Sequence, residues 1–212
     1  MVYQIEVVER DVRIAIDENK VSGQFLIDED IDTLSLNDII RSKIVEAVRR
    51  VETVAPVGLL EEGHLFGDAV YWEGNGSGWV LLPDDFMRLI AFRMSDWERT
   101  CHVAIGVEDP LYDLQSSRCK GVRGNVQKPV CAMVNRAEGK ALEFYSCDSE
   151  EACVTRASYI PYPCIDGDGG VDISERCYTA VVYTVAALVL TAVGASERAS
   201  AMNALAKSML EK

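Results

Sequence analysis

The sequence has few of the residues on which enzymes depend for acid–base chemistry at neutral pH. Only two of its 212 residues are histidines, His64 and His102, and their spacing does not suggest a metal site. His102 directly follows Cys101, so on a strand the two side chains point to opposite faces and form no catalytic dyad. A nucleophile motif of the Gly-x-Ser-x-Gly kind is absent as well. We therefore expect no enzymatic activity.

The cysteines lack the spacing of a zinc or redox site. There are seven, an odd number, and no two of them have the Cys-x-x-Cys spacing. The N-terminus has acidic residues within its apolar stretch, which is not typical of a signal peptide. We expect reduced thiols, mostly buried as small hydrophobic side chains in a cytosolic product, and neither a metal nor another cofactor.

Two glycine-rich stretches lack the residues that would make them ligand sites. The segment GNGSG, residues 74–78, has no Lys-Ser/Thr pair and does not open a helix, which favours a hairpin tip over a phosphate loop. An EF-hand alignment from Asp166 puts Val171 at the sixth position and Cys177 at the twelfth, where Gly and a bidentate Glu are required. A turn followed by a helix cap explains these acidic residues better than calcium binding.

Positive charge is also scarce. The chain has 21 Lys and Arg against 34 Asp and Glu, a formal net charge of −13. Nucleic acid and anionic lipid repel such a chain except at a local basic patch. One patch is present, consisting of Arg118, Lys120, Arg123, Lys128, Arg136 and Lys140. Its loop is either merely solvated or docks on an acidic partner, and nucleic acid is the weaker alternative because no aromatic residues interleave.

The apolar pattern predicts an α+β fold, with a helical bundle and a β-rich middle region. Residues 1–34 are expected to be an extended, acidic N-terminal segment, and residues 35–212 a single domain. Ser35 caps a helix over residues 35–55, and Asp38 completes a capping box. The stripe that this helix would bury consists of Ile40, Ile44, Val48, Val51 and Ala55.

Residues 68–161 are predicted to be the β-rich lobe. Aromatic and β-branched residues on both sides of a glycine-rich tip predict a hairpin over 69–83. Residues 84–97 are expected to form one helical turn that leads into a strand, and residues 106–128 a loop. Three further strands are expected over 129–134, 141–147 and 153–160.

A helical hairpin is predicted over residues 172–211. Asp172 and Glu175 form a second capping box at its start, and Gly194 ends the first helix. The second helix covers 196–210, with an apolar stripe of Ala199, Met202, Leu205 and Met209.

The stretch 178–196 contains no charged residue and by length alone could cross a bilayer. Three threonines and many alanines dilute its hydrophobicity, however, and no Lys/Arg cluster fixes an orientation. A helix that is apolar on nearly all sides is otherwise the buried centre of a protein. We therefore expect a core helix whose buried side chains include Val181, Val185, Leu188 and Val189.

The order of these segments resembles a known family. A helix ending in "VETVAP" is followed by "LPDDFMRLIAFRMSDW", "RGNVQKPVCAMV", "ALEFYSC" and "ASYIPYP", and then by a closing helix pair. This layout, over residues 36–210, resembles the head-to-tail adaptor proteins of short-tailed bacteriophages, of the tail-tubular-protein-A type and the first ring protein of crAss-like phages. The first 33 residues and the cysteines have no counterpart in that family.

The resemblance implies a structural virion protein at the head–tail neck, made in the bacterial host cytoplasm. Family members form a ring, usually of twelve copies, below the portal protein. The ring extends the DNA channel, which DNA crosses without specific binding, and it is a platform for the next tail protein. The family has no catalytic site. Its C-terminal segment commonly docks on the portal, which implies that the portal-facing candidate here is the stretch from Ala204 through Leu210 and Lys212. Its interface candidates are Leu205, Lys207, Met209 and Leu210.

A ring of identical subunits uses a heterologous interface, in which one face binds a different face of the neighbour. The basic loop supplies the candidates for such a contact, namely Arg118, Lys120, Arg123 and Lys128. Three alternatives remain open: an interaction module unrelated to virions, a protein with one C-terminal membrane span, and a cysteine-dependent enzyme.

Overall fold

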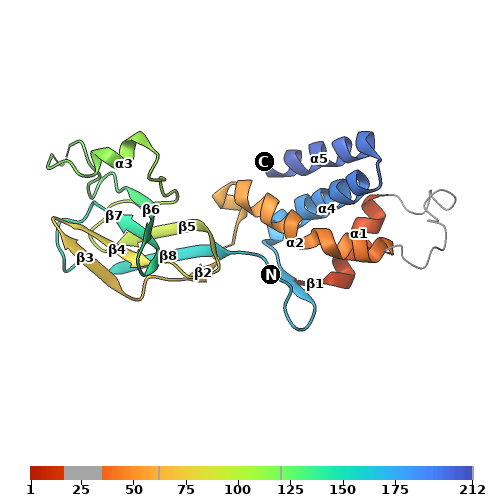
Figure 1. The fold of residues 1–212 in the computed structure, drawn as a ribbon, viewed down its shortest axis with the longest axis horizontal. Helices are drawn as coiled ribbons and strands as arrows, with labels where there is room; N and C mark the ends of the chain where they lie inside the picture. Colours follow the sequence, from red (N-terminus) through yellow and green to blue (C-terminus); the bar gives the residue numbers. More distant parts are fainter. Residues whose placement is uncertain (17–34, 62, 120, 212) are drawn as a thin grey trace. The chain divides into compact units, whose positions relative to one another are not determined.

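The computed structural model describes residues 1–16, 35–61, 63–119 and 121–211. They form a mixed α+β fold whose sheets are antiparallel. We predicted one domain from residue 35, but the chain divides into two compact units (Figure 1). Met1–Glu61 and Pro163–Lys212 form the first, here called the helical unit, and Glu62–Tyr162 form the second, the β unit. The β unit is thus inserted into the sequence of the helical unit.

Helix α1, Ile5–Ala15, replaces the extended structure predicted for this part of the N-terminal segment. The prediction was wrong here because β-branched residues suggested strands, whereas the apolar side chains recur three and four positions apart. The side chains that this spacing buries are Ile5, Val8, Val12 and Ile16. Residues 17–34, including the predicted acidic segment, lie outside the described residues.

Helix α2, Leu36–Val54, confirms the helix predicted from its capping box. Ser35 Oγ accepts a hydrogen bond of 3.2 Å from the Asp38 backbone N–H, and Asp38 Oδ2 accepts one of 3.2 Å from the Ser35 N–H. The predicted apolar stripe is buried throughout. A 3-10 helix, η2 (Val57–Leu59), follows α2.

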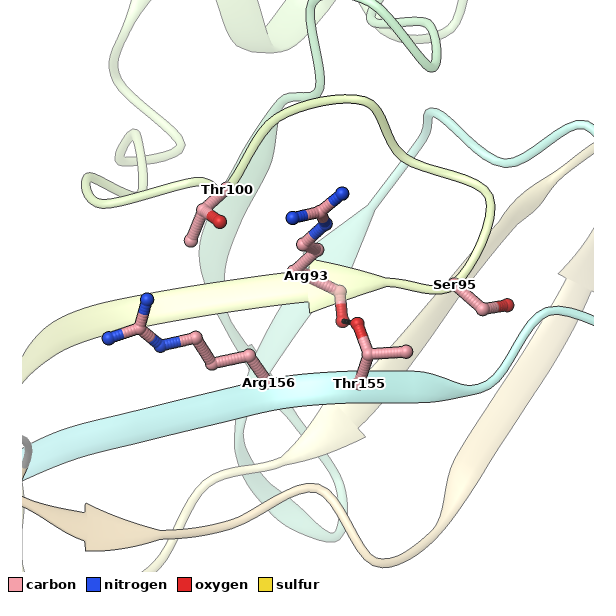
Figure 2. A pocket seen from close by; sticks show the side chains of 5 residues that line it. All are labelled: Arg93, Ser95, Thr100, Thr155 and Arg156. Carbon is pink, nitrogen blue, oxygen red and sulfur yellow. Dashed lines mark hydrogen bonds between the residues drawn. The ribbon is translucent and has the colours of Figure 1, made fainter.

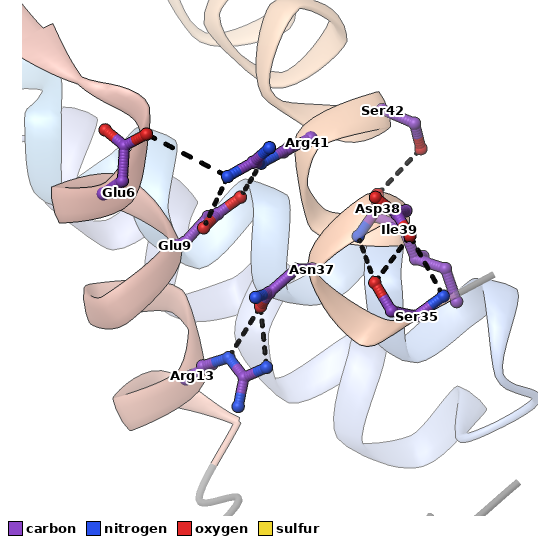
Figure 3. A network of polar contacts seen from close by, with 9 residues as sticks. All are labelled: Glu6, Glu9, Arg13, Ser35, Asn37, Asp38, Ile39, Arg41 and Ser42. Atoms are coloured by element: carbon purple, nitrogen blue, oxygen red, sulfur yellow. Dashed lines mark hydrogen bonds and ion pairs between the residues drawn. The ribbon is translucent and has the colours of Figure 1, made fainter. Parts of the chain in front are cut away.

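Polar side chains join α1 to α2 (Figure 3). Arg13 on α1 donates two hydrogen bonds, of 2.9 and 2.7 Å, to the Asn37 side chain on α2. Arg41, one turn further along α2, pairs with the buried carboxylate of Glu9, which lies one turn earlier on α1. Because Glu9 is only 6 % exposed, this partner satisfies a charge that would otherwise be costly to bury.

Helices α4, Tyr178–Ala192, and α5, Ser196–Leu210, form the last part of the chain. Gly194 ends α4 as predicted, in the left-handed conformation at φ +80°, which favours glycine. The bounds of α5 also confirm the prediction.

The capping box predicted at Asp172 and Glu175 is wrong. Strand β9, Gly170–Asp172, pairs with β1, Val2–Gln4, and the 3-10 helix η3 (Glu175–Cys177) precedes α4. Asp172 caps no helix because its Oδ1 accepts a hydrogen bond of 2.7 Å from the N-terminal ammonium group. Strand β1 lies within the segment predicted to be extended, and the ammonium group at its start binds the carboxylate that we had assigned to the helix cap.

Helix α4 lies at the centre of the helical unit. It contacts α1, α2 and α5, and all four helices contribute to one apolar core. Three of its predicted core residues, Val181, Val185 and Val189, are buried, whereas Leu188 is partly buried.

Helix α4 is too short to cross a bilayer. At about 1.5 Å per residue, the length of its 15 residues is less than the roughly 30 Å thickness of the hydrocarbon layer. Within the described residues, no helix is long and apolar enough to cross a membrane.

Two antiparallel sheets build the β unit. Their strands confirm the predicted hairpin and the three later strands, and residues 84–85 form a simple turn instead of the predicted helical turn. The first sheet has the order β2 (His64–Leu65), β8 (Val154–Pro161) and β5 (Phe86–Met94). The second has the order β3 (Val70–Gly74), β4 (Ser77–Leu81), β7 (Gly139–Phe144) and β6 (Cys131–Arg136).

Both sheets contribute side chains to the core of the β unit. Phe92 of β5 lies 5.9 Å from Phe144 of β7 between ring centroids, and Trp97 meets both rings edge to face. All three rings are fully buried, so the β unit is stabilised both by the large apolar area that they remove from water and by their edge-to-face contacts.

The glycine-rich stretch between β3 and β4 is a hairpin tip, as predicted. Gly74, Asn75 and Gly76 all have positive φ, of 92°, 59° and 72°. A Cβ at Gly76 would lie 1.9 Å from the carbonyl oxygen of Cys147. The positive φ values of the turn favour glycine at these positions, and the close approach of the Cys147 backbone leaves no room for a side chain at Gly76.

Candidate functional site

The C-terminal residues predicted to face the portal divide between two faces of α5. Leu205, 41 % exposed, and Lys207 are exposed, whereas Met209 and Leu210 pack against the core of the helical unit. The residues of α5 that are buried or pack against the core are Ala199, Met202, Ala206, Met209 and Leu210. The predicted stripe contained Leu205, whereas the structure buries Ala206. The stripe was therefore wrong at Leu205, which leaves an apolar side chain accessible to a partner.

The predicted basic loop presents two of its four candidate cations. Arg118 and Lys128 are exposed, and Lys120 lies outside the described residues. Arg123 is only 6 % exposed, and its Nη2 donates a hydrogen bond of 2.9 Å to the backbone oxygen of Asn75 at the hairpin tip. Arg123 thus holds the loop against the hairpin, and its assignment to an exposed interface was wrong.

The loop over residues 106–128 is more ordered than we predicted. It contains a short helix, α3 (Pro110–Leu114), capped by the Asp109 side chain. The buried Gln115 accepts a hydrogen bond of 2.8 Å from the Gly124 N–H and donates one of 2.7 Å to the Leu111 oxygen. The bond from Gly124 ties the residue that follows α3 to a later part of the loop, and Arg118 lies between these two positions in the sequence.

Arg136, the next member of the basic patch, is neutralised by acidic neighbours. It pairs with Glu73 at 2.6 Å and with the buried Glu143, and its guanidinium lies 5.0 Å from the ring centre of Trp79. Glu143 also accepts a hydrogen bond from Tyr145, whose pKa is raised mainly by burial and also by this carboxylate. No local motif marks this network, because strand pairing brings its members together.

Cys101 and His102 point in different directions, as their adjacency predicted. Cys101 is buried and His102 is exposed, with its Nδ1 2.6 Å from the Ile90 carbonyl oxygen. A hydrogen bond with Cys131 lowers the pKa of the Cys101 thiol, although burial opposes this effect. Among the described residues, no group of three or more His, Cys, Asp or Glu side chains could hold a metal ion.

A polar pocket on the β unit is the feature that sequence reasoning missed (Figure 2). Its volume is about 330 Å³, and it lies where β5, β8 and the loop after β5 meet. The side chains that line it are those of Arg93, Ser95, Thr100, Thr155 and Arg156. The two arginines are far apart in the sequence and meet only because β5 pairs with β8, so no local motif could reveal the pocket.

The pairing of β5 with β8 also explains the arrangement of the lining residues. Arg93 is the Cα partner of Arg156, and Met94 is the partner of Val154. Thr155 is therefore an extra residue at a β-bulge, and its hydroxyl donates a hydrogen bond of 3.1 Å to the Arg93 backbone oxygen. Bulges redirect side chains, which allows the consecutive residues Thr155 and Arg156 to line the same pocket.

A second, smaller pocket of about 210 Å³ lies beside α1 and α4 of the helical unit. Ile14, 68 % exposed, lies at its edge, and Tyr178 and Val182 contribute further apolar surface. The Tyr178 hydroxyl donates a hydrogen bond of 2.7 Å to Asp11, and burial together with this carboxylate raises the pKa of Tyr178. This pocket, here called the apolar groove, is therefore lined by a Tyr178 side chain that Asp11 holds in place and by the exposed apolar side chain of Ile14.

No protein-family model matches the sequence, and no curated protein matches it either.

Proposed function

We propose that this chain is a structural virion protein, a head-to-tail adaptor that assembles into a ring below the phage portal. The ring, of twelve copies in the family that the sequence resembles, extends the DNA channel and supports the next tail protein. Its place is the head–tail neck of the virion. DNA passes through the channel without sequence-specific binding.

The order of the elements supports this proposal most directly. Helix α2 precedes the β unit, and α4 and α5 follow it, which is the layout on which the resemblance rests. We further propose that α1, α2, α4 and α5 form a bundle around α4, which contacts each of the other three. An adaptor needs such a rigid body because each subunit must hold two neighbours at a constant angle.

The surface chemistry is compatible with contact between copies in a ring. Head-to-tail contact brings two different faces of the chain together, and the chain carries both signs of charge on separate segments. Arg118 and Lys128 are exposed cations in a chain of net charge −13, so an acidic neighbour is available in every copy. The apolar groove beside Ile14 offers area that association would remove from water.

Portal docking is assigned to the exposed face of α5. Leu205 and Lys207 are the exposed members of the predicted portal-facing set. Met209 and Leu210 contribute indirectly, because they pack against the core and fix the end of the helix. A net acidic channel wall would also favour DNA passage, because like charge removes the phosphate attraction that dominates non-specific binding.

Light scattering coupled to size-exclusion chromatography tests this function. The purified chain, alone or mixed with the portal protein of the same phage, should elute as a closed oligomer or as a portal complex. Protein that stays monomeric in both experiments would contradict the proposal. A matched charge control is Lys140→Glu, which changes an exposed cation outside the proposed contacts and should not alter the elution.

A further inference from the structure

Three buried cysteines lie together in the core of the β unit. Cys101, Cys131 and Cys147 belong to one apolar cluster, and all seven cysteines of the chain are free thiols. Neither the proposed ring contacts nor portal docking uses these three. Buried cysteines are ordinarily inert, small hydrophobic side chains, so the surroundings of each thiol decide whether it can react.

Cys101 and Cys131 bring two thiols together from different sheets. Cys101 is joined to β5 of the first sheet, because its N–H and C=O form two hydrogen bonds of 2.8 Å with the backbone of Phe92. Cys131 begins β6 of the second sheet, where it pairs with Phe144 of β7. The Cys101 Sγ lies 3.5 Å from the Pro129 oxygen, and the Cys131 thiol donates a hydrogen bond to the Cys101 sulfur. The two thiols therefore meet between the sheets, on backbones that strand pairing holds in place.

The two thiols differ in exposure and in acidity. Cys131 is completely buried, whereas Cys101 is 9 % exposed. The hydrogen bond from the Cys131 thiol lowers the pKa of Cys101, although burial opposes this effect. Burial and the neighbouring Cys101 thiol raise the pKa of Cys131 well above its ordinary value, and burial with the nearby Asp96 raises the pKa of Cys147 to about 12. Cys101 is therefore the thiol of this cluster that ionises first and that a small reagent can reach.

We propose that Cys101 and Cys131 are a redox-active pair, in which hydrogen peroxide oxidises Cys101 and Cys131 then closes a disulfide between the two sheets. The Cys101 thiolate attacks one peroxide oxygen, the O–O bond breaks, and the departing hydroxide takes up the proton that the thiol released. The Cys131 sulfur then displaces the sulfenic hydroxyl of Cys101, which leaves as water with the Cys131 proton. The two thiols lose two electrons in all, and one peroxide is reduced to two waters.

The disulfide would fix the loop that follows β5. The segment that carries α3, Arg118 and Lys128 begins after Cys101 and ends before Cys131, so the bond would hold both of its ends. A cross-link of this kind also restricts the unfolded chain, which stabilises the folded state. The chemistry depends only on the two thiols and is the same whether or not the chain assembles into a ring.

Peptide mapping of the full chain tests the pair. The protein is treated with an equimolar amount of hydrogen peroxide, its remaining thiols are alkylated, and it is denatured and digested with trypsin. Cleavage after arginine releases Cys101 in the peptide 100–118 and Cys131 in the peptide 124–136, each without a second cysteine. Mass spectrometry should find these two peptides linked before reduction and separate after it. Cys131→Ala should abolish the link, and the matched control Cys153→Ser, which removes an exposed cysteine of the β unit, should leave it unchanged.

Other products of the same digest would overturn the proposal. Dimedone that traps Cys101 as a sulfenic acid, with no link to Cys131 even in its absence, would show that the two thiols do not pair. A link between Cys131 and Cys147 would show that the partner is wrong. The free Cys101 thiol should also disappear at least about 10-fold faster than that of Cys147, since the thiolate is the reactive form. Equal rates would show that Cys101 is as inert as its buried neighbour.

Thermal unfolding gives a second measurement that does not depend on digestion. Oxidation should raise the Tm of wild type by roughly 5–10 °C, because the cross-link restricts the unfolded chain, and it should leave the Tm of Cys131→Ala unchanged. A reductant should reverse the rise. A wild-type Tm that oxidation does not raise would contradict a disulfide between the sheets.

Discussion

Glu52 on α2 accepts a hydrogen bond of 2.9 Å from the backbone N–H of Ser174, which lies just before η3 and α4. The carboxylate is only 4 % exposed, so this bond links two distant parts of the chain inside the helical unit. Burial raises the pKa of Glu52 above its ordinary value of 4.5, although the bonds from Ser174 oppose the change. The ionised form is therefore less stable in the folded protein than in water.

This raised pKa predicts a pH-dependent effect of Glu52→Gln. The folded state holds the Glu52 proton more tightly than the unfolded state does, so the contribution to stability is present below pH 4.5 and is lost as the pH rises through the folded pKa. Relative to wild type, the variant should gain unfolding free energy between about pH 4 and pH 7. Urea unfolding followed by circular dichroism measures this difference at each pH. If the unfolding free energy of wild type instead increases relative to that of the variant as the pH rises, the raised pKa of Glu52 is refuted.

The hairpin tip predicts unequal effects of two glycine substitutions. Gly76→Ala should lower the unfolding free energy by about 2 kcal/mol, because φ is +72° and a Cβ would meet the Cys147 carbonyl. Gly167→Ala is the control, since nothing lies within 4 Å of a Cβ at that position. Thermal unfolding of both variants should show a loss for Gly76→Ala alone. Equal losses would mean that the tip does not need its glycine.

Adjacent positions on α5 are expected to respond in opposite ways. Ala206→Glu places a carboxylate against the core of the helical unit and should cost about 2 kcal/mol or more of unfolding free energy. Leu205→Glu changes an exposed side chain and should stay within about 0.5 kcal/mol of wild type. If the adaptor proposal holds, Leu205→Glu should nevertheless reduce co-sedimentation with the portal. Stable Ala206→Glu protein would show that α5 packs through a different face.

The basic loop predicts that assembly and folding depend on different arginines. The double variant Arg118→Glu, Lys128→Glu should fold normally and lose ring or portal assembly, because both side chains are exposed. Arg123→Glu should instead lower the unfolding free energy by about 3 kcal/mol or more, since it leaves a buried charge beside the Asn75 oxygen. Light scattering and urea unfolding distinguish the two effects. If the double variant assembles normally, the basic loop is merely solvated and makes no assembly contact.

The sequence predicted elements whose periodicity and end signals agree. Helix α2 has both an apolar stripe and a capping box, and α5 begins after Gly194, so local chemistry determined their bounds. Helix α1 was missed because its β-branched residues favour strands locally, whereas packing against α2 and α4 decides its conformation. Asp172 was misassigned because its partner, the N-terminal ammonium group, lies at the other end of the sequence.

The candidate sites were predictable only where exposure follows from the local sequence. Arg118 was expected to be exposed, and it is. Arg123 in the same loop is instead buried, with its side chain hydrogen-bonded to the hairpin tip. The pocket could not be predicted, because the register of β5 against β8 and the bulge at Thr155 create it. Such long-range pairings leave no periodic signal in the sequence.

Negative-stain electron microscopy of the purified chain mixed with the portal protein tests the central claim most directly. The adaptor account predicts closed rings with a central channel, stacked coaxially on portal rings, and it predicts that Leu205→Glu breaks the stacking while the fold is kept. Fields of isolated single subunits beside unoccupied portal rings, at concentrations well above those in an infected cell, would contradict it.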